Sequence, residues 1–369
     1  MKKILMLASE ASHFRNFHIP YIKYLRHKGD KVFTASNGSF DMDGVTHFYV
    51  PFKKSMTSPG NVITIFKLAG LIRKEKFDIV YTNSTLAGFM GRMAVIISRL
   101  KTVKAFHICH GYLFNDDGGK KAKTYLFFEK LVRKRTDLLI VMNKDDLEIA
   151  EKYSLGKQIS FIKGMGLDTK KFPPADEEKI SDMRKSLGAD ENTLLFLCAA
   201  EFSPRKNQYT IIKALSLLKR SDCKMIFAGD GELFEECRAL AVQLGVDDRT
   251  VFLGHFRDMN LLYRSCDCLI SAGRFEGLPF NVMEALYCGE NVILSNVKGN
   301  KDLAVSANDI GTALGEAAAA VLFPYGGFEQ LSKLMETAKK PSTSVCRLSE
   351  KYFLENALTE NIELFHIND

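Results

Sequence analysis

The sequence lacks the features that define several whole classes of protein. None of its apolar stretches approaches the roughly 18 consecutive residues of a membrane span. The opening run, MKKILMLASE, is too short for a secretory signal before Glu10. The eight cysteines form no Cys-x-x-Cys pair, which disfavours zinc and, without an export signal, disulfides. We therefore expect a cytoplasmic protein with reduced thiols.

Two recognition motifs are also missing, which narrows the functions that the uneven charge distribution allows. Residues 1–165 contain 28 Lys and Arg against 14 Asp and Glu, whereas residues 166–369 contain 23 against 30. A basic half predicts an anionic partner, which is nucleic acid, a membrane surface or a phosphorylated substrate. No nucleic-acid recognition motif accompanies the charge, so we expect no nucleic acid. No Gly-x-Gly-x-x-Gly follows the first apolar strand, which argues against a nicotinamide-dependent dehydrogenase.

The composition is that of a chain able to build two packed domains. Its 369 residues are about twice the prior of ~150 per domain, and 46% hydrophobic with 26% charged residues is ordinary for a packed protein. Short apolar strands alternate with helical patterns from KKILMLAS to NVILS, with a first helix from about Phe17 to Gly29. This alternation predicts an α/β fold in which helices cover both faces of parallel sheets.

The alternation lapses at FIKGMGLDTKKFPPADEE, which contains a Pro-Pro pair and marks a domain boundary. We predict a first doubly wound, Rossmann-like domain at 1–165 and a second at 166–345. Residues 346–369 are expected to form a helix that crosses back to the first domain. Such sheets bind ligands beyond the carboxyl ends of their strands, so two facing domains predict a central cleft.

The stretch SAGRFEGLPFNVMEALYCG carries the strongest functional pattern. A strand is expected to end at Glu276, and a helix to begin near Phe280 with Glu284 one turn in. The backbone N–H groups of that first turn and the helix dipole suit a phosphate. The turn comprises Phe280, Asn281 and Val282. Glu276 suits sugar hydroxyls and Glu284 suits ribose hydroxyls, unless the two carboxylates only stabilise the helix N-terminus.

The second functional pattern is AAEFSPRKNQYTIIKAL. Arg205 and Lys206 follow a buried strand and precede a helix that starts near Asn207. A fork-shaped donor beside a point charge at a helix N-terminus suits a diphosphate. The alternative is a solvated basic pair on the surface.

The first half offers weaker candidates. His110 ends the strand AFHICH, where it is placed to contact a sugar hydroxyl or the reaction centre, although a lone histidine is more often structural. In the loop SEASHFRNFH, His13 and Arg15 are candidates for contact with an acceptor.

These segments resemble glycosyltransferase family 4, whose signature is two glutamates separated by seven residues in an EGLP...EA context. The resemblance implies the GT-B fold, a nucleotide-sugar donor, retention of anomeric configuration, and neutralisation of the donor phosphates by Arg205 and Lys206. FAGDGE and FLGHFRD resemble the family's nucleotide loops, with structural turns as the alternative. The residues matched to these loops are Gly229, Gly254, His255 and Phe256.

Within the family the chain looks closest to bacterial capsule and exopolysaccharide enzymes. This implies a UDP-sugar donor and a lipid-linked saccharide acceptor at the cytoplasmic membrane face, with catalytic roles for Glu276, Arg205, Lys206 and His110. No Asp-x-Asp motif appears where a metal-dependent transferase would carry it, so neither a metal nor another cofactor is expected. The competing hypothesis is a catalytically inactive nucleotide-sugar-binding scaffold subunit of a polysaccharide assembly complex.

The segment GKKAKTYLFFEKLVRKR predicts attachment to an anionic membrane surface. Its apolar stripe at helical spacing is Tyr125, Phe128 and Val132. The basic residues around that stripe are Lys120, Lys121, Lys123, Lys130, Arg133, Lys134 and Arg135. The alternative is that the stripe packs on the sheet and leaves the lysines solvated.

Overall fold

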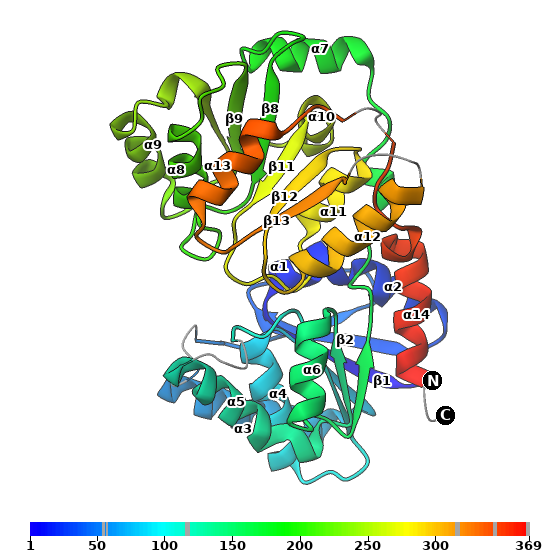
Figure 1. The fold of residues 1–369 in the computed structure, drawn as a ribbon. Helices are drawn as coiled ribbons and strands as arrows, with labels where there is room; N and C mark the ends of the chain where they lie inside the picture. Colours follow the sequence, from blue (N-terminus) through cyan, green and yellow to red (C-terminus); the bar gives the residue numbers. More distant parts are fainter. Residues whose placement is uncertain (54–55, 57, 115–118, 314–317, 342–344, 367–369) are drawn as a thin grey trace. The chain divides into compact units, whose positions relative to one another are not determined.

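The computed structural model describes residues 1–53, 56, 58–114, 119–313, 318–341 and 345–366. The chain divides into two compact units, one formed by Met1–Met165 with the C-terminal segment from Ala357, and the other by Gly166–Asn356. Each unit is an α/β domain built on one parallel sheet (Figure 1). The predicted fold class is confirmed.

The first domain has a seven-stranded sheet in the order β3-β2-β1-β4-β5-β6-β7. Strands β4 and β6 are buried along their whole length, and most of their residues are apolar, because helices cover both faces of a parallel sheet. The strands are β1 Lys3–Glu10, β2 Lys31–Asn37, β3 Thr46–Tyr49, β4 Ile79–Asn83, β5 Lys104–Cys109, β6 Leu138–Val141 and β7 Gln158–Phe161.

The helices of the first domain connect successive strands. They are α1 Ala11–His13, α2 Ile19–His27, α3 Pro59–Glu75, α4 Thr85–Ser98, α5 Lys120–Val132 and α6 Lys144–Lys152. A π-helical turn, Phe14–His18, joins α1 to α2, and the 3-10 turn Arg133–Arg135 follows α5. The first helical segment therefore begins at Ala11, earlier than the expected Phe17, because the π turn interrupts the α-helical spacing of its apolar residues.

The C-terminal helix is α14, Leu354–His366, and from Ala357 onward it belongs to the first domain. Asn361 Nδ2 donates to the Tyr21 hydroxyl at 2.7 Å and to the Gly164 carbonyl at 2.9 Å. The ring of Phe365 lies edge-on to that of Tyr81, with 4.9 Å between centroids. Helix α14 is thus held by buried polar and aromatic contacts.

The second domain has a six-stranded sheet in the order β10-β9-β8-β11-β12-β13. Its strands are β8 Leu194–Ala199, β9 Cys223–Ala228, β10 Thr250–Gly254, β11 Cys268–Ser271, β12 Asn291–Ser295 and β13 Ala320–Phe323. Its helices are α7 Glu177–Ser186, α8 Gln208–Ser216, α9 Phe234–Gln243, α10 Met259–Ser265, α11 Phe280–Tyr287, α12 Asn300–Ala313 and α13 Phe328–Thr337. The 3-10 turns are Thr169–Lys171, Asp247–Arg249 and Glu350–Tyr352.

The basic helix α5 departs from the expected membrane-facing arrangement. Val132 is fully buried, and Phe128 packs against Phe89 with 4.9 Å between ring centroids. On the same inner face, Glu129 forms a buried two-pronged ion pair with Arg92 of α4, at 2.8 and 2.9 Å. The predicted stripe of Tyr125, Phe128 and Val132 therefore faces the domain core, as the alternative had it, because its helical spacing matches the apolar surface beneath it.

Two general expectations concern membrane spans and thiols. None of the helices in the described residues combines the length and the apolar character that crossing a membrane requires. All eight cysteines are free thiols, and seven of them are buried.

Candidate active site

The candidate donor site lies at the switch point of the second sheet. From the neighbouring strands β8 and β11, the sheet continues in opposite directions, to β9 and β10 on one side and to β12 and β13 on the other. A crevice opens beyond the carboxyl ends of two such strands, and it is the usual ligand site of an open α/β sheet. Arg205 and Lys206 follow β8, and Glu276 follows β11.

The structure brings these three side chains together. Lys206 Nζ donates to Glu276 Oε1 at 2.7 Å, and Arg205 Nη1 donates to Oε2 at 3.3 Å. Glu276 is only 6% exposed, and Lys206 is also largely buried, whereas the Arg205 side chain is 42% exposed. We call Arg205, Lys206 and Glu276 the basic clamp. Because two cations pair with one carboxylate, the group has an excess of one positive charge, which suits an anionic ligand.

Hydrogen bonds to backbone carbonyls hold the two loops of the basic clamp together. The Arg274 N–H donates to the Arg205 carbonyl at 2.8 Å, and Asn207 Nδ2 donates to the Ala272 carbonyl at 3.4 Å. Asn207 adopts a left-handed conformation (φ 57°) that turns the chain into α8. A Cβ on Gly273 would lie 2.6 Å from Glu276 Oε1, so any side chain there would displace the carboxylate.

The position of Glu276 corrects one sequence prediction. Strand β11 ends at Ser271, so Glu276 does not end a strand but lies in the loop before α11. The extra residues allow Gly273 to leave room for the carboxylate and Ser295 Oγ to donate to the Gly273 carbonyl at 2.7 Å. Sequence patterns did not single out Asn207, Gly273 or Ser295, since each acts through a loop contact between distant segments.

Helix α11 begins at Phe280, as predicted. Pro279 precedes it and provides no side-chain cap to the helix N-terminus. Asn281 Nδ2 donates to the Ala199 carbonyl at 3.0 Å and so ties the first turn to the end of β8, while Val282 is fully buried. The N-terminus of α11 is therefore fixed at the same edge of the sheet as the basic clamp.

Glu284 lies in the second turn of α11 and accepts a hydrogen bond from the Tyr263 hydroxyl at 2.8 Å. Burial raises the pKa of Glu284, although the Tyr263 hydrogen bond and the charge of Lys171 act in the opposite direction. Tyr263 is itself buried on α10. It orients the carboxylate, and nothing in its sequence context distinguished it from an ordinary core tyrosine.

The glycine loops have partly structural explanations. A Cβ on Gly229 (φ 141°) would lie 2.0 Å from the Ala200 carbonyl oxygen, so close backbone packing requires glycine there. The Gly229 N–H donates to the Gly254 carbonyl at 2.7 Å, which leaves that N–H unavailable to a nucleotide. His255 is exposed beyond the end of β10, and Phe256 is partly exposed. A contact from Gly254, His255 or Phe256 to a base stays a prediction.

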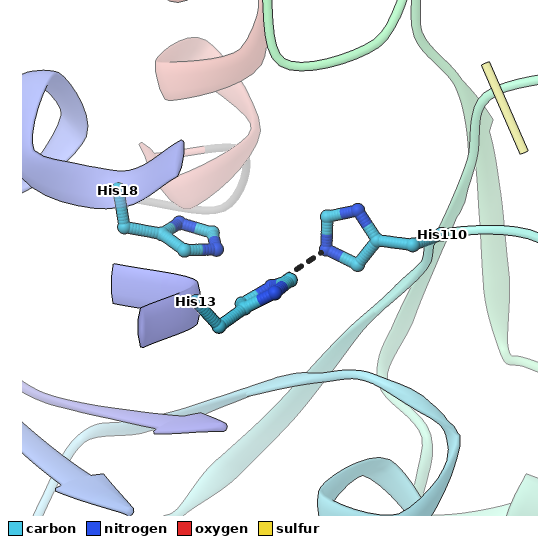
Figure 2. A group of neighbouring side chains, drawn as sticks. All are labelled: His13, His18 and His110. Carbon is cyan, nitrogen blue, oxygen red and sulfur yellow. Dashed lines mark hydrogen bonds between the residues drawn. The ribbon is translucent and has the colours of Figure 1, made fainter. Parts of the chain in front are cut away.

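The candidates of the first domain also lie beyond strand ends. His110 directly follows β5, and its Nε2 lies 3.3 Å from His13 Nε2 (Figure 2). The same His110 Nε2 lies 3.4 Å from Asn83 Oδ1. Burial lowers the pKa of His13 to about 4 and that of His110 well below its usual range, so both imidazoles are neutral near pH 7. Arg15 is exposed and instead donates to the Ser39 carbonyl at 2.8 Å. The structure thus joins His13 to His110 but not to Arg15.

His18, which the sequence analysis did not select, lies against both of these histidines. Its ring centroid is 5.0 Å from that of His13 and 6.2 Å from that of His110. A spacing of five residues does not place two side chains on one face of an α-helix. Only the π turn, with its i→i+5 pattern, makes His13 and His18 neighbours.

Comparison with known proteins identifies related families over both domains. Residues 179–345 match the family described as "Glycosyl transferases group 1", and residues 27–156 match "Glycosyl transferase 4-like domain". EpsD of Bacillus subtilis, which is named as a glycosyltransferase, is 29% identical over 309 residues, covering 82% of this chain and 81% of its own. An Escherichia coli UDP-Gal:alpha-D-GlcNAc-diphosphoundecaprenol alpha-1,3-galactosyltransferase is 29% identical over 271 residues, covering 71% and 69%.

Solved structures share the fold over the whole chain. A glycosyltransferase from Rickettsia africae superimposes with a TM-score of 0.77 at 18% identity, covering 100% of this chain and 99% of its own. Anabaena HepE in complex with UDP and glucose gives a TM-score of 0.76 at 19% identity, covering 99% and 100%. At these identities the likeness concerns the fold.

Proposed function

Because this chain belongs to glycosyltransferase family 4, with the GT-B fold, we propose that it transfers a sugar from a UDP-sugar to a lipid-linked saccharide with retention of configuration. The observation that carries the proposal is the basic clamp at the switch point, where Arg205 and Lys206 converge on the buried Glu276. A binding protein without chemistry has less use for cations gathered where a diphosphate would leave.

The clamp acts on the charge that develops as the donor breaks. When the bond between the anomeric carbon and the diphosphate oxygen breaks, negative charge grows on the diphosphate. The exposed guanidinium of Arg205 and the ammonium of Lys206 stabilise that charge with no metal assigned to it. The N-terminus of α11, at Phe280, Asn281 and Val282, adds its positive dipole.

The two glutamates have different roles in this proposal. Glu276 accepts hydrogen bonds from hydroxyls of the donor sugar, and its own salt bridges keep it oriented. Glu284, oriented by Tyr263, accepts from the ribose hydroxyls. The incoming acceptor hydroxyl forms its bond to the anomeric carbon on the face that the diphosphate leaves, and a donor phosphate oxygen takes its proton.

The remaining candidates contact the ends of the substrates. Backbone groups at Gly254, His255 and Phe256 hold the base, and His110 contacts a sugar hydroxyl. His13 and Arg15 are assigned to the acceptor. The acceptor class is supported by two relatives named for diphospho-undecaprenol-linked substrates, the Escherichia coli galactosyltransferase and a Campylobacter jejuni alpha-1,3-N-acetylgalactosaminyltransferase that is 23% identical over 83% of this chain.

A lipid-linked acceptor requires contact with a membrane, and we assign that contact to the outer face of α5. Phe127 and Leu131 are 60% and 50% exposed there. Lys123, Lys130 and Lys134 are exposed at matching helical spacing. An apolar pair surrounded by lysines is suited to the surface of an anionic membrane, at the cytoplasmic side where nucleotide sugars are made.

The test is transfer by the purified full chain with a panel of UDP- and GDP-sugars and a diphosphate-linked saccharide as the acceptor. We expect a glycosylated lipid product with the anomeric configuration of the donor, determined by NMR, and UDP-sugars preferred to GDP-sugars. UDP binding without turnover of any donor would support the scaffold hypothesis instead. Transfer with inverted configuration would overturn the proposed mechanism.

A further inference from the structure

Three histidines of the first domain present their rings to one another. His13 and His18 come from the segment that follows β1, and His110 comes from the end of β5 (Figure 2). One ring nitrogen from each lies within 4.8 Å of the other two. Among the described residues, no other group of three His, Cys, Asp or Glu side chains gathers its ligand atoms so closely.

The backbone arrangement that produces this cluster is unusual. The π-helical turn Phe14–His18 begins directly after His13. Such turns are rare and occur frequently at functional sites, because they bring together side chains that an α-helix would separate. An uninterrupted α-helix would turn His18 away from His13 and leave only a pair of histidines.

His18 supplies an independent sign that a ligand belongs here. Its side chain is fully buried, and neither Nδ1 nor Nε2 has a hydrogen-bond partner among the described residues. A buried imidazole with both nitrogens unsatisfied is costly, since each loses its hydrogen bonds to water.

The distances fit coordination to a metal. Ligands at about 2.0–2.1 Å from a tetrahedral zinc ion lie about 3.3–3.4 Å from one another. His13 Nε2 and His110 Nε2 are 3.3 Å apart. The remaining separations, of up to 4.8 Å, require only small ring movements toward a shared ion.

We propose that His13, His18 and His110 form a binding site for one divalent transition-metal ion of the zinc type, with a coordination position open to an oxygen ligand. Neutral imidazoles are preferred ligands of zinc, copper and nickel, whereas magnesium and calcium prefer oxygen. Three protein ligands leave a tetrahedral ion one position for water or a hydroxyl. The site lies in the first domain and uses two residues, His13 and His110, to which the proposed function assigns direct substrate contacts. With an ion bound, its open position would take over those contacts, and no metal is assigned to the basic clamp.

The sequence expectation of no zinc site was based on short ligand motifs. Cysteine pairs and Asp-x-Asp are recognised by their spacing, but this cluster combines residues 97 positions apart, from His13 to His110. The cluster depends on a π turn and on two strands of one sheet, and both become visible only in the folded chain.

The experiment is titration of the chelator-treated full chain with Co²⁺, which reports coordination through its visible absorption. We expect intense d–d bands of tetrahedral Co²⁺ that saturate at one ion per chain and disappear when Zn²⁺ is added. The bands should persist in His27→Ala, a variant of an exposed histidine in the same domain. In His18→Ala, affinity should fall by at least ten- to hundredfold.

Two controls exclude unfolding of the variant and metal binding by cysteine. Because His18 is buried, thermal unfolding must first show that His18→Ala is folded, and otherwise His13→Asn and His110→Asn, at partly exposed positions, replace it. Thiolate coordination by cysteine would produce a strong near-ultraviolet charge-transfer band. The proposal is overturned by that band, by the absence of tetrahedral Co²⁺ at excess metal, or by equal affinity in wild type and the folded variants. Since no sugar nucleotide is present, none of these outcomes depends on the proposed transferase activity.

Discussion

Lys206 Nζ lies 2.7 Å from Oε1 of Glu276, in a contact almost closed to solvent that joins the loop after β8 to the loop after β11. The contact has a structural and a catalytic side. A buried carboxylate needs a partner to remain ionised, and the same lysine carries charge to the edge of the sheet where a diphosphate would leave. Arg205 lies on the exposed side of Glu276 and contributes less to the stability of the fold.

Lys206→Ala is therefore expected to lower both turnover and stability. Its removal leaves Glu276 buried with Arg205 as its one remaining cationic partner among the described residues. We expect roughly 1–3 kcal/mol of destabilisation and about a hundredfold lower kcat. Urea unfolding and steady-state kinetics measure the two effects. Lys213→Ala, an exposed lysine of α8, is the matched control, and stability equal to that control would contradict the structural role.

Glu276→Gln should retain the fold and UDP affinity but reduce turnover. The amide has the shape of the carboxylate, but it loses the charge and part of the acceptor capacity that hold the sugar hydroxyls. Calorimetry with UDP and kinetics with the full donor separate the two properties. Glu191→Gln alters an exposed glutamate of the same domain and should behave as wild type. If UDP binding collapses while transfer survives, the roles of Glu276 and Glu284 are reversed.

Glu290→Gln should remove a pH dependence of stability. Glu290 is buried, neither carboxyl oxygen has a hydrogen-bond partner among the described residues, and burial, followed by the charge of Asp267, raises its pKa well above the usual 4.5. The folded state retains this proton after the unfolded chain has lost it. The stability contributed by this group is therefore greatest below pH 4.5, falls by up to about 1.4 kcal/mol per pH unit between pH 4.5 and the folded pKa, and levels off above it.

Unfolding free energies measured between pH 5 and 8 test this expectation. Glu290→Gln should be the more stable protein at neutral pH, with the difference growing as the pH rises. Glu360→Gln, at an exposed position, should follow the wild type. Equal slopes for wild type and Glu290→Gln would mean that Glu290 is ionised in the folded state.

Membrane attachment should depend on the outer face of α5. The affinity for anionic vesicles at low salt, measured by sedimentation, should be about thirtyfold lower in Lys123→Ala/Lys134→Ala. Each lysine contributes about 1 kcal/mol of binding free energy before screening. Phe127→Ser/Leu131→Ser should also weaken binding, through lost insertion of apolar area. Val242→Ser, an equally exposed apolar position of the second domain, is the control. Equal binding of wild type to neutral and anionic vesicles, or none to either, would end the membrane assignment.

The features that depend only on neighbouring residues in the chain were predicted best from the sequence. Buried strands such as Leu194–Ala199 and the helix start at Phe280 are apparent from apolar runs and turn residues, and they emerge as predicted. The short, half-exposed edge strands β3 and β7 were missed because their side chains alternate too weakly to separate a strand from a loop.

Features that depend on long-range contact escaped prediction. The orientation of α5 needed the partner of Glu129, which is Arg92, 37 residues earlier. The room for Glu276 depends on Gly273 lacking a Cβ, and the third histidine depends on a π turn. In each case the sequence contains the residue, but it does not show which distant residue lies next to it in the fold.

The central claim is that Arg205 stabilises the diphosphate as it leaves, and the most direct measurement compares kcat and UDP affinity in wild type and Arg205→Ala. Because the Arg205 side chain is 42% exposed, its removal should leave the unfolding free energy nearly unchanged. We expect about a hundredfold lower kcat, or ~3 kcal/mol of barrier, with a much smaller loss of UDP affinity. Near-native turnover in Arg205→Ala, or a loss of UDP affinity as large as the loss of kcat, would contradict the claim.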